Sequence, residues 1–236
     1  MILLHAATGS SRVWDYQIPA FAAAGYRVIA FDRRGWGRTE IDSAEPQPGT
    51  AAGDLLGLLD QLHLDRAHIV GTAAGGFVAL DFTLSYPRRV RSLVIANSIG
   101  GVEDADYLEL GRRLRPPGFA NLPPDFRELG PSYRAGNASG AARWVELEKV
   151  SRPPGPTTPV QPLRNHITFA ALGTIQAPTL LLTGDADLYA PPPILRFFAA
   201  RIKSSETFVI PEAGHSAYWE RPELFNRTVL EFLRQH

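Results

Sequence analysis

Short apolar runs alternate with helical patterns along most of this chain, and this alternation restricts the fold more than any other feature. Strands connected through helices run parallel and form a sheet that helices cover on both faces. The segment 92–96, Ser-Leu-Val-Ile-Ala, is apolar almost without interruption, as expected for a strand buried on both faces. The predicted strands are residues 2–5, 27–31, 67–70, 90–96, 179–182 and 207–210. The predicted helices are residues 14–24, 51–62, 74–85, 192–201 and 222–234.

The interval 99–172 interrupts this alternation. It shows only two helical stretches, 104–113 and 141–150, separated by many prolines. A structureless loop of this length is rare inside a compact domain. We therefore predict an inserted helical cap over residues 99–172. The prolines of the interval include Pro116, Pro117, Pro123, Pro124, Pro153, Pro154, Pro156, Pro159 and Pro162.

A turn framed by Gly71 and Gly75 joins a predicted strand to the helix that follows it. The two glycines enclose Thr72, Ala73 and Ala74. Nucleophile elbows of the pattern G-x-S-x-G occur in this setting, because only small residues let strand and helix approach around a strained central residue. Ala73 therefore holds the place of a nucleophilic serine. Taken alone this turn is weak evidence, since small-residue turns between strands and helices are common.

Five further segments resemble motifs that the α/β-hydrolase fold superfamily carries at corresponding places. The chain order of nucleophile position, acid and histidine is also that of the family. The resemblance, to serine esterases, lactonases and C–C hydrolases, covers the whole chain except the interval 99–172, where it is loose. It implies an α/β-hydrolase core made of residues 1–98 and 173–236, and a hydrolase activity. The five segments are LLHAA at 3–7, DRRGWGR at 32–38, PRRV at 87–90, GDAD at 184–187 and GH at 214–215.

The resemblance implies a role for each motif residue. Ala73 marks the nucleophile site, and His215 is the general base that deprotonates a serine hydroxyl. Asp187 fixes the tautomer of His215 and stabilises its charged form. The amides of Ala7 and Ala74 form the oxyanion hole.

Three neighbouring residues qualify these assignments. Asp185 competes with Asp187 for the acid role, but the G-x-x-D spacing favours Asp187. His5 is expected to be structural, packed under the oxyanion loop. Ala6 replaces the glycine that usually follows this histidine, a change that we expect to tighten or tilt the loop.

An alanine methyl group cannot attack a carbonyl, and losing a serine nucleophile typically removes about a million-fold in rate. Three explanations compete: a deliberate serine-to-alanine substitution, natural loss that leaves a binding protein or pseudoenzyme, and replacement of an aspartate nucleophile as in dehalogenases and epoxide hydrolases. Those last relatives usually carry a bulky aromatic residue where this chain has Ala74. Asp187 and His215 keep their motif positions, which favours the first explanation.

A carboxylic ester or lactone is the substrate class that we prefer. A C–C bond hydrolase of ring-cleavage products is an alternative, supported if an arginine of the interval faces inward, but Ser216 stands where those enzymes often carry tryptophan. A non-catalytic small-molecule binding protein is another alternative, and a cofactor-free oxygenase is a third. The candidate substrate-binding residues are Trp144, Leu188, Tyr189 and Ser216.

Composition excludes several other classes. Lys and Arg number 24 and Asp and Glu number 24, so no basic excess exists to bind nucleic acid. The chain has no cysteine and no apolar run near the ~20 residues that span a bilayer. The absence of cysteine fits a cytoplasmic protein, which we expect. We expect no metal, because no histidine pair has metal-ligand spacing. We also expect no cofactor, because Gly35-Trp36-Gly37 lacks the third glycine of a dinucleotide site. A homodimer stays open.

The N-terminus departs from the family pattern. Met1 lies where the third strand of the family begins, so its first two strands are expected to be missing. In that case the predicted strand at 27–31 becomes an exposed edge of the sheet, which is a liability for aggregation.

Overall fold

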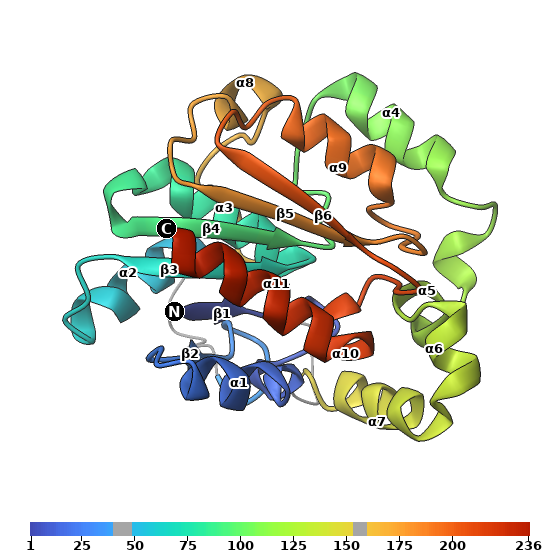
Figure 1. Ribbon diagram of the computed structural model, residues 1–236. Coiled ribbons are helices and arrows are strands. Elements are labelled where there is room, and N and C mark those ends of the chain that lie inside the picture. The colour runs from blue at the N-terminus through green and yellow to red at the C-terminus, as the bar shows by residue number, and fades with distance from the viewer. Residues whose placement is uncertain (40–48, 153–159) are drawn as a thin grey trace.

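The chain forms a six-stranded sheet in the order β2-β1-β3-β4-β5-β6, and every pairing within it is parallel. The computed structural model describes residues 1–39, 49–152 and 160–236, so four prolines of the interval, Pro153, Pro154, Pro156 and Pro159, lie outside the described residues (Figure 1). The prediction of a parallel α/β sheet is confirmed. The strands are β1 (Ile2–Leu4), β2 (Ile29–Ala30), β3 (Ala67–Thr72), β4 (Val90–Ala96), β5 (Thr179–Gly184) and β6 (Ser205–Ile210).

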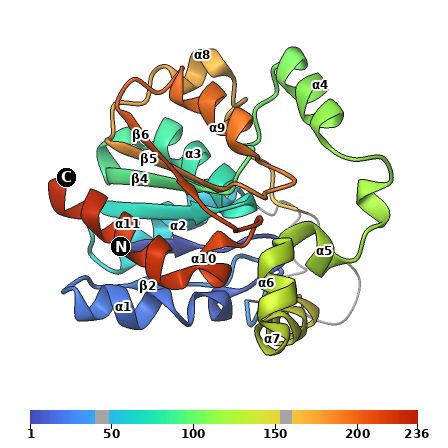
Figure 2. The same cartoon turned by 45° about the vertical axis from the view of Figure 1, so that its right-hand side comes forward.

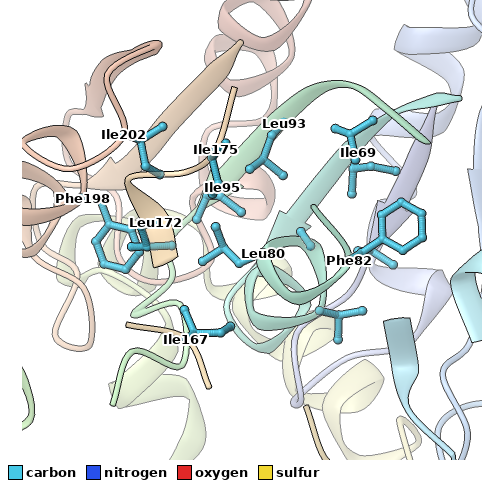
Figure 3. Packing of buried hydrophobic residues seen from close by; sticks show 14 of the residues in the cluster. Ile69, Leu80, Phe82, Leu93, Ile95, Ile167, Leu172, Ile175, Phe198 and Ile202 are labelled. Carbon is cyan, nitrogen blue, oxygen red and sulfur yellow. The ribbon is translucent and has the colours of Figure 1, made fainter. Parts of the chain in front are cut away.

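Helices cover both faces of the sheet. Successive residues of a strand point to opposite faces, so each strand contributes side chains to two hydrophobic clusters. Ile69 and Leu93 belong to the hydrophobic cluster on one face, and Val70 and Val94 to the cluster on the other. Figure 3 shows the first cluster, in which Ile69 and Leu93 pack with side chains of α3. Helices α2 (Ala51–Gln61), α3 (Ala74–Ser85), α8 (Phe169–Leu172) and α9 (Pro192–Ala199) contribute to this cluster, and α1 (Gln17–Ala23), α10 (Ala217–Glu220) and α11 (Pro222–Gln235) to the other.

Two N-terminal elements are shorter than predicted. The strand expected at 27–31 is reduced to β2, which pairs only with β1 and so forms one edge of the sheet. Ile2 pairs with Ile29 and Leu3 with Ala30. The helix expected at 14–24 begins only at Gln17 as α1, and a separate 3₁₀ turn, η1 (Ser11–Trp14), precedes it. Pro19 explains this break, since a residue without an amide hydrogen is tolerated only in the first turn of a helix.

The interval 99–172 is largely helical, with α4 (Ala105–Leu114), η3 (Phe119–Asn121), α5 (Pro124–Glu128), α6 (Pro131–Gly136), α7 (Ala138–Lys149) and then α8. Figures 1 and 2 show α5, α6 and α7 beside the edge of the sheet where the strands end. The end of the interval packs against the core instead. The backbone amides of Arg164 and Asn165 bind the carboxylate of Asp81 on α3, at 2.8 and 2.9 Å, and Ile167 is fully buried with α3 and α9. We propose 99–172 as the inserted segment, with its last part packed into the core.

Candidate active site

A strained turn at Ala73 joins β3 to α3. Ala73 has φ +48° and ψ −117°, a conformation that costs a non-glycine residue about 1–3 kcal/mol. A Cβ atom on Gly71 would lie 2.4 Å from the carbonyl oxygen of Gly75, and one on Gly75 would lie 2.1 Å from that of Leu4. Both flanking positions therefore require glycine.

Neighbouring strands hold this turn in place. The Ala73 amide donates to the carbonyl oxygen of Ala96 at 3.0 Å, and the Ser98 hydroxyl donates to the carbonyl oxygen of Ala73 at 2.6 Å. The preceding side chain, Thr72, is fully buried and does not line the cavity around Ala73. A hydroxyl on residue 73 is thus presented to that cavity, whereas the Thr72 hydroxyl is not.

His215 meets Asp187 behind this cavity. The Nδ1 atom of His215 lies 2.9 Å from Oδ2 and 3.0 Å from Oδ1 of Asp187, and both side chains are buried. Asp185 is exposed, so the structure brings Asp187 rather than Asp185 to the histidine. Four other groups donate hydrogen bonds to the Asp187 carboxylate, namely Asn97 Nδ2, Thr183 Oγ1, Tyr189 N and Ala190 N.

The electrostatics of this pair suit a general base. Burial opposes charge on both groups, yet the Asp187 carboxylate raises the pKa of His215 above its usual value. Burial likewise opposes the carboxylate, but the charge and hydrogen bond of His215 lower the pKa of Asp187 below its usual value. A proton on Nδ1, which faces Asp187, leaves Nε2 free to accept one.

A cavity of about 250 Å³ brings most of the predicted site together. It contains both candidate oxyanion residues, the nucleophile position, the histidine and Tyr189. The segments that form it are far apart in the sequence and meet at the ends of the strands. Its lining residues are Ala6, Ala7, Thr8, Ala73, Ala74, Phe77, Ile99, Arg115, Glu128, Tyr189 and His215.

Two backbone amides are available to this cavity. Ala74 is the first residue of α3, so its amide has no acceptor within the helix. The Ala7 amide has no acceptor among the described residues, while the Ala7 carbonyl accepts from Trp36 Nε1 at 2.9 Å. His5 supports the loop from below, since it is fully buried and its Nδ1 lies 2.7 Å from the carbonyl oxygen of Ala6. Burial lowers the pKa of His5 to about 3, so its ring is neutral.

Three of the four candidate substrate-binding residues lie elsewhere. Trp144, a residue of α7, is buried in the cluster on the α11 face of the sheet. Ser216 is buried, and its amide donates to the carbonyl oxygen of Glu128, which seals that position. Leu188 lines a separate surface cavity. Tyr189 is the candidate that lines the cavity of Ala73 and His215.

The cavity is lined by two charged residues, Arg115 and Glu128. Sequence reasoning missed Glu128, and it allowed for an inward-facing arginine in the interval without singling out Arg115. Both lie in the interval 99–172, where no motif distinguishes an inward-facing side chain from a solvated one. Asn97, which donates to Asp187, was missed as well. Asn97 directly follows β4 and has a φ of +49°. Asparagine adopts a positive φ more readily than most residues do.

Two negative findings concern the part of the chain that the structure describes. There, no helix is both long and apolar enough to cross a membrane. Within the same residues, no three histidine, aspartate or glutamate side chains form a group able to hold a metal ion.

Comparison with known proteins fits this architecture. The sequence profile described as "Alpha/beta hydrolase family" matches residues 1–228. This chain belongs to the α/β-hydrolase family. The 2-hydroxy-6-oxononadienedioate/2-hydroxy-6-oxononatrienedioate hydrolase of Burkholderia vietnamiensis is 32% identical to this α/β-hydrolase over 255 residues, which cover 100% of this chain and 87% of that protein. The putative non-heme bromoperoxidase BpoC of Mycobacterium tuberculosis is 30% identical over 243 residues, covering 95% of this chain and 89% of its own.

Solved structures agree with the assignment. A malate-bound thermophilic esterase from Thermogutta terrifontis superposes with a TM-score of 0.82 at 26% identity, over 99% of this chain and 89% of that one. The predicted α/β-hydrolase fold is therefore confirmed. The named activities of these relatives differ, so family membership alone does not define the reaction of this chain.

Proposed function

We propose that this protein is an α/β-hydrolase for a carboxylic ester or lactone, in a form whose nucleophile position carries alanine. One observation carries the proposal. The buried His215, 2.9 Å from Asp187, lines the same cavity as the strained Ala73 and the amides of Ala7 and Ala74.

With serine at position 73, these groups support an acyl-enzyme mechanism. The serine oxygen attacks the substrate carbonyl carbon while His215 takes its proton, and the amides of Ala7 and Ala74 stabilise the oxyanion. His215 then protonates the leaving alcohol, and the same base activates water to release the acid. With Ala73 the acyl transfer step has no nucleophile, while substrate binding is kept.

We interpret Ala73 as a replacement of serine, and we favour a deliberate substitution. The support is that Asp187, His215 and the strained turn persist, although a buried charge pair and a strained backbone both cost free energy. A natural binding protein or pseudoenzyme is the alternative, and Ala73 itself supports it. That alternative predicts affinity for small molecules and no turnover even when serine is restored.

A C–C bond hydrolase is the second candidate function. Two observations favour it: the activity for which the Burkholderia relative is named, and Arg115 in the lining of the cavity. A guanidinium there suits a substrate carboxylate.

We also propose a cytoplasmic protein with a small-molecule substrate and no nucleic-acid partner. A homodimer is an alternative to a monomer, and sedimentation velocity distinguishes the two.

The test is the Ala73→Ser variant, assayed with short 4-nitrophenyl esters. Because the serine oxygen is placed beside His215 and two amides, kcat/KM should rise at least about a thousandfold over the Ala73 chain. Ala74→Ser is the matched control, since it adds a hydroxyl one residue away and should give no such gain. A folded Ala73→Ser protein without ester turnover would refute the hydrolase proposal, and faster cleavage of a ring-cleavage diketone would favour the second candidate.

A further inference from the structure

Glu128 is a buried acid in the cavity that the proposed mechanism does not use. It is the last residue of α5, its exposed fraction is 4%, and it lines the same cavity as Ala73 and His215. Its Oε2 atom has no hydrogen-bond partner among the described residues. Its main-chain carbonyl accepts from Ser216, so the backbone is held independently of the side chain.

The surroundings of Glu128 leave it as a polar group in a mainly apolar cavity. Tyr189 lines the cavity beside Glu128, and the ring centroid of Tyr189 lies 4.3 Å from that of His215. Most of the remaining lining consists of small or apolar residues, such as Phe77 and Ile99. A buried polar atom left unpaired costs free energy, which a ligand that pairs it recovers.

Glu128 can both donate and accept a hydrogen bond. Burial raises the pKa of Glu128, although the nearby His215 and Arg127 charges oppose this. The carboxyl group therefore keeps its proton at a higher pH than an exposed glutamate does. A protonated carboxyl donates through its hydroxyl and accepts through its carbonyl oxygen.

We propose that Glu128 binds a hydroxyl group on the acyl ligand, so that the cavity selects hydroxy-acyl esters or lactones. A hydroxyl satisfies either state of the acid, because it accepts from the carboxyl and donates to the carboxylate. An alkyl chain leaves the free oxygen unpaired, and a ligand carboxylate is repelled by the ionised form. This inference deepens the proposed function and rests on it for the acyl nature of the ligand.

Arg115 favours a different ligand group from Glu128, namely a carboxylate. Its guanidinium lies 5.7 Å from the ring centroid of Tyr189, and its Nε atom is also without a partner among the described residues. A ligand carboxylate that reached Arg115 would outweigh the preference set by Glu128. The two residues therefore make opposite predictions about charge on the ligand.

The experiment titrates the Ala73 chain with three esters of similar size by NMR: methyl butanoate, methyl 3-hydroxybutanoate and monomethyl succinate. We expect the hydroxy ester to bind about tenfold more tightly than the other two, as one additional buried hydrogen bond provides. Equal affinities, tightest binding of monomethyl succinate, or no binding of any ester would each overturn the proposal.

Variants assign the preference to the side chain. Glu128→Leu should abolish the preference for the hydroxy ester, and the isosteric Glu128→Gln should keep part of it. Glu146→Gln is the control, because Glu146 is an exposed residue of α7 paired with Lys149. A preference that survives in a folded Glu128→Leu variant contradicts the proposal; if this variant does not fold, an unaltered preference in Glu128→Gln at pH 5 and pH 9 contradicts it.

The outcome is separable from that of the proposed function. If Ala73→Ser hydrolyses all three esters with the same kcat/KM, the hydrolase stands and the hydroxyl subsite fails. If the Ala73 chain prefers the hydroxy ester but Ala73→Ser turns over none, the subsite stands and the hydrolase fails.

Discussion

Ala73 has a strained backbone conformation that an alanine side chain does not require. The hydrogen bonds from its amide to Ala96 and from Ser98 to its carbonyl fix the turn regardless of the side chain. A serine at this position needs no backbone movement to face the cavity. The same reasoning applies to Asp187, whose five hydrogen-bonding neighbours orient it whether or not a nucleophile is present.

The acid can be tested by exchanging each of the two candidate aspartates in the Ala73→Ser background. Asp187→Asn should lower kcat by about 10⁴, because the amide favours the wrong tautomer of His215. Asp185→Asn should stay within about twofold of the parent, since Asp185 is exposed. Steady-state ester hydrolysis measures both, and a large loss from Asp185→Asn with none from Asp187→Asn would reverse the assignment.

At the scale of elements, the approach of β1, β3 and α3 decides the shape of the site. Gly75→Ala should destabilise the fold by about 2–3 kcal/mol, because its Cβ would lie 2.1 Å from the Leu4 carbonyl oxygen. Gly57→Ala in α2 is the control: no atom lies within 4 Å of its Cβ, and alanine should stabilise this exposed helical position by about 0.5–1 kcal/mol. Urea unfolding followed by circular dichroism measures both, and equal effects would contradict the packing.

Glu220 on α10 ties the histidine loop to the segment after α5. Its carboxylate accepts from the amides of Gly130 at 2.8 Å and Gly214 at 3.0 Å, and the two glycine backbones touch, since a Cβ on Gly214 would lie 2.4 Å from the Gly130 nitrogen. This contact fixes His215 and Glu128 relative to each other.

Burial raises the pKa of Glu220 from 4.5 to about 7, although backbone amides, that of Gly214 foremost, lower it. In the unfolded chain the group ionises near 4.5, so the folded state binds more protons between these two values. Stability from this residue is therefore present below the unfolded pKa and lost as pH rises through 7. The unfolding free energy of the parent, relative to Glu220→Gln, should fall by about 2–3 kcal/mol between pH 5 and pH 8. A constant or rising difference in urea titrations would contradict this.

The sequence predicted the elements with strong periodicity and missed those without it. The helix at 74–85 and the strand at 90–96 have the predicted bounds. Helices α5 and α6 were not predicted, because five or six residues contain too little periodicity to recognise. Asp187 and His215 follow strands in recognisable motifs, whereas Glu128 enters the cavity through packing between distant segments, which no local pattern records.

At the scale of the whole molecule, the sheet gathers the site from segments spread over most of the chain. The candidate oxyanion loop follows β1, the turn at Ala73 follows β3, the candidate acid Asp187 follows β5 and His215 follows β6. Parallel strands end at the same edge of a sheet, so this arrangement is a consequence of the fold rather than of any one contact. The helical interval then contributes Arg115 and Glu128 to the cavity.

We propose that residue 73, His215, Asp187 and two amides form one reactive site. Labelling with a fluorophosphonate tests it most directly, because a serine oxygen must displace fluoride while His215 takes the proton. Ala73→Ser should gain one covalent label, mapped by mass spectrometry to the peptide containing residue 73. The Ala73 chain, and Ala73→Ser combined with His215→Asn, should stay unlabelled. A folded Ala73→Ser protein that stays unlabelled, or that is labelled equally well without His215, would contradict it.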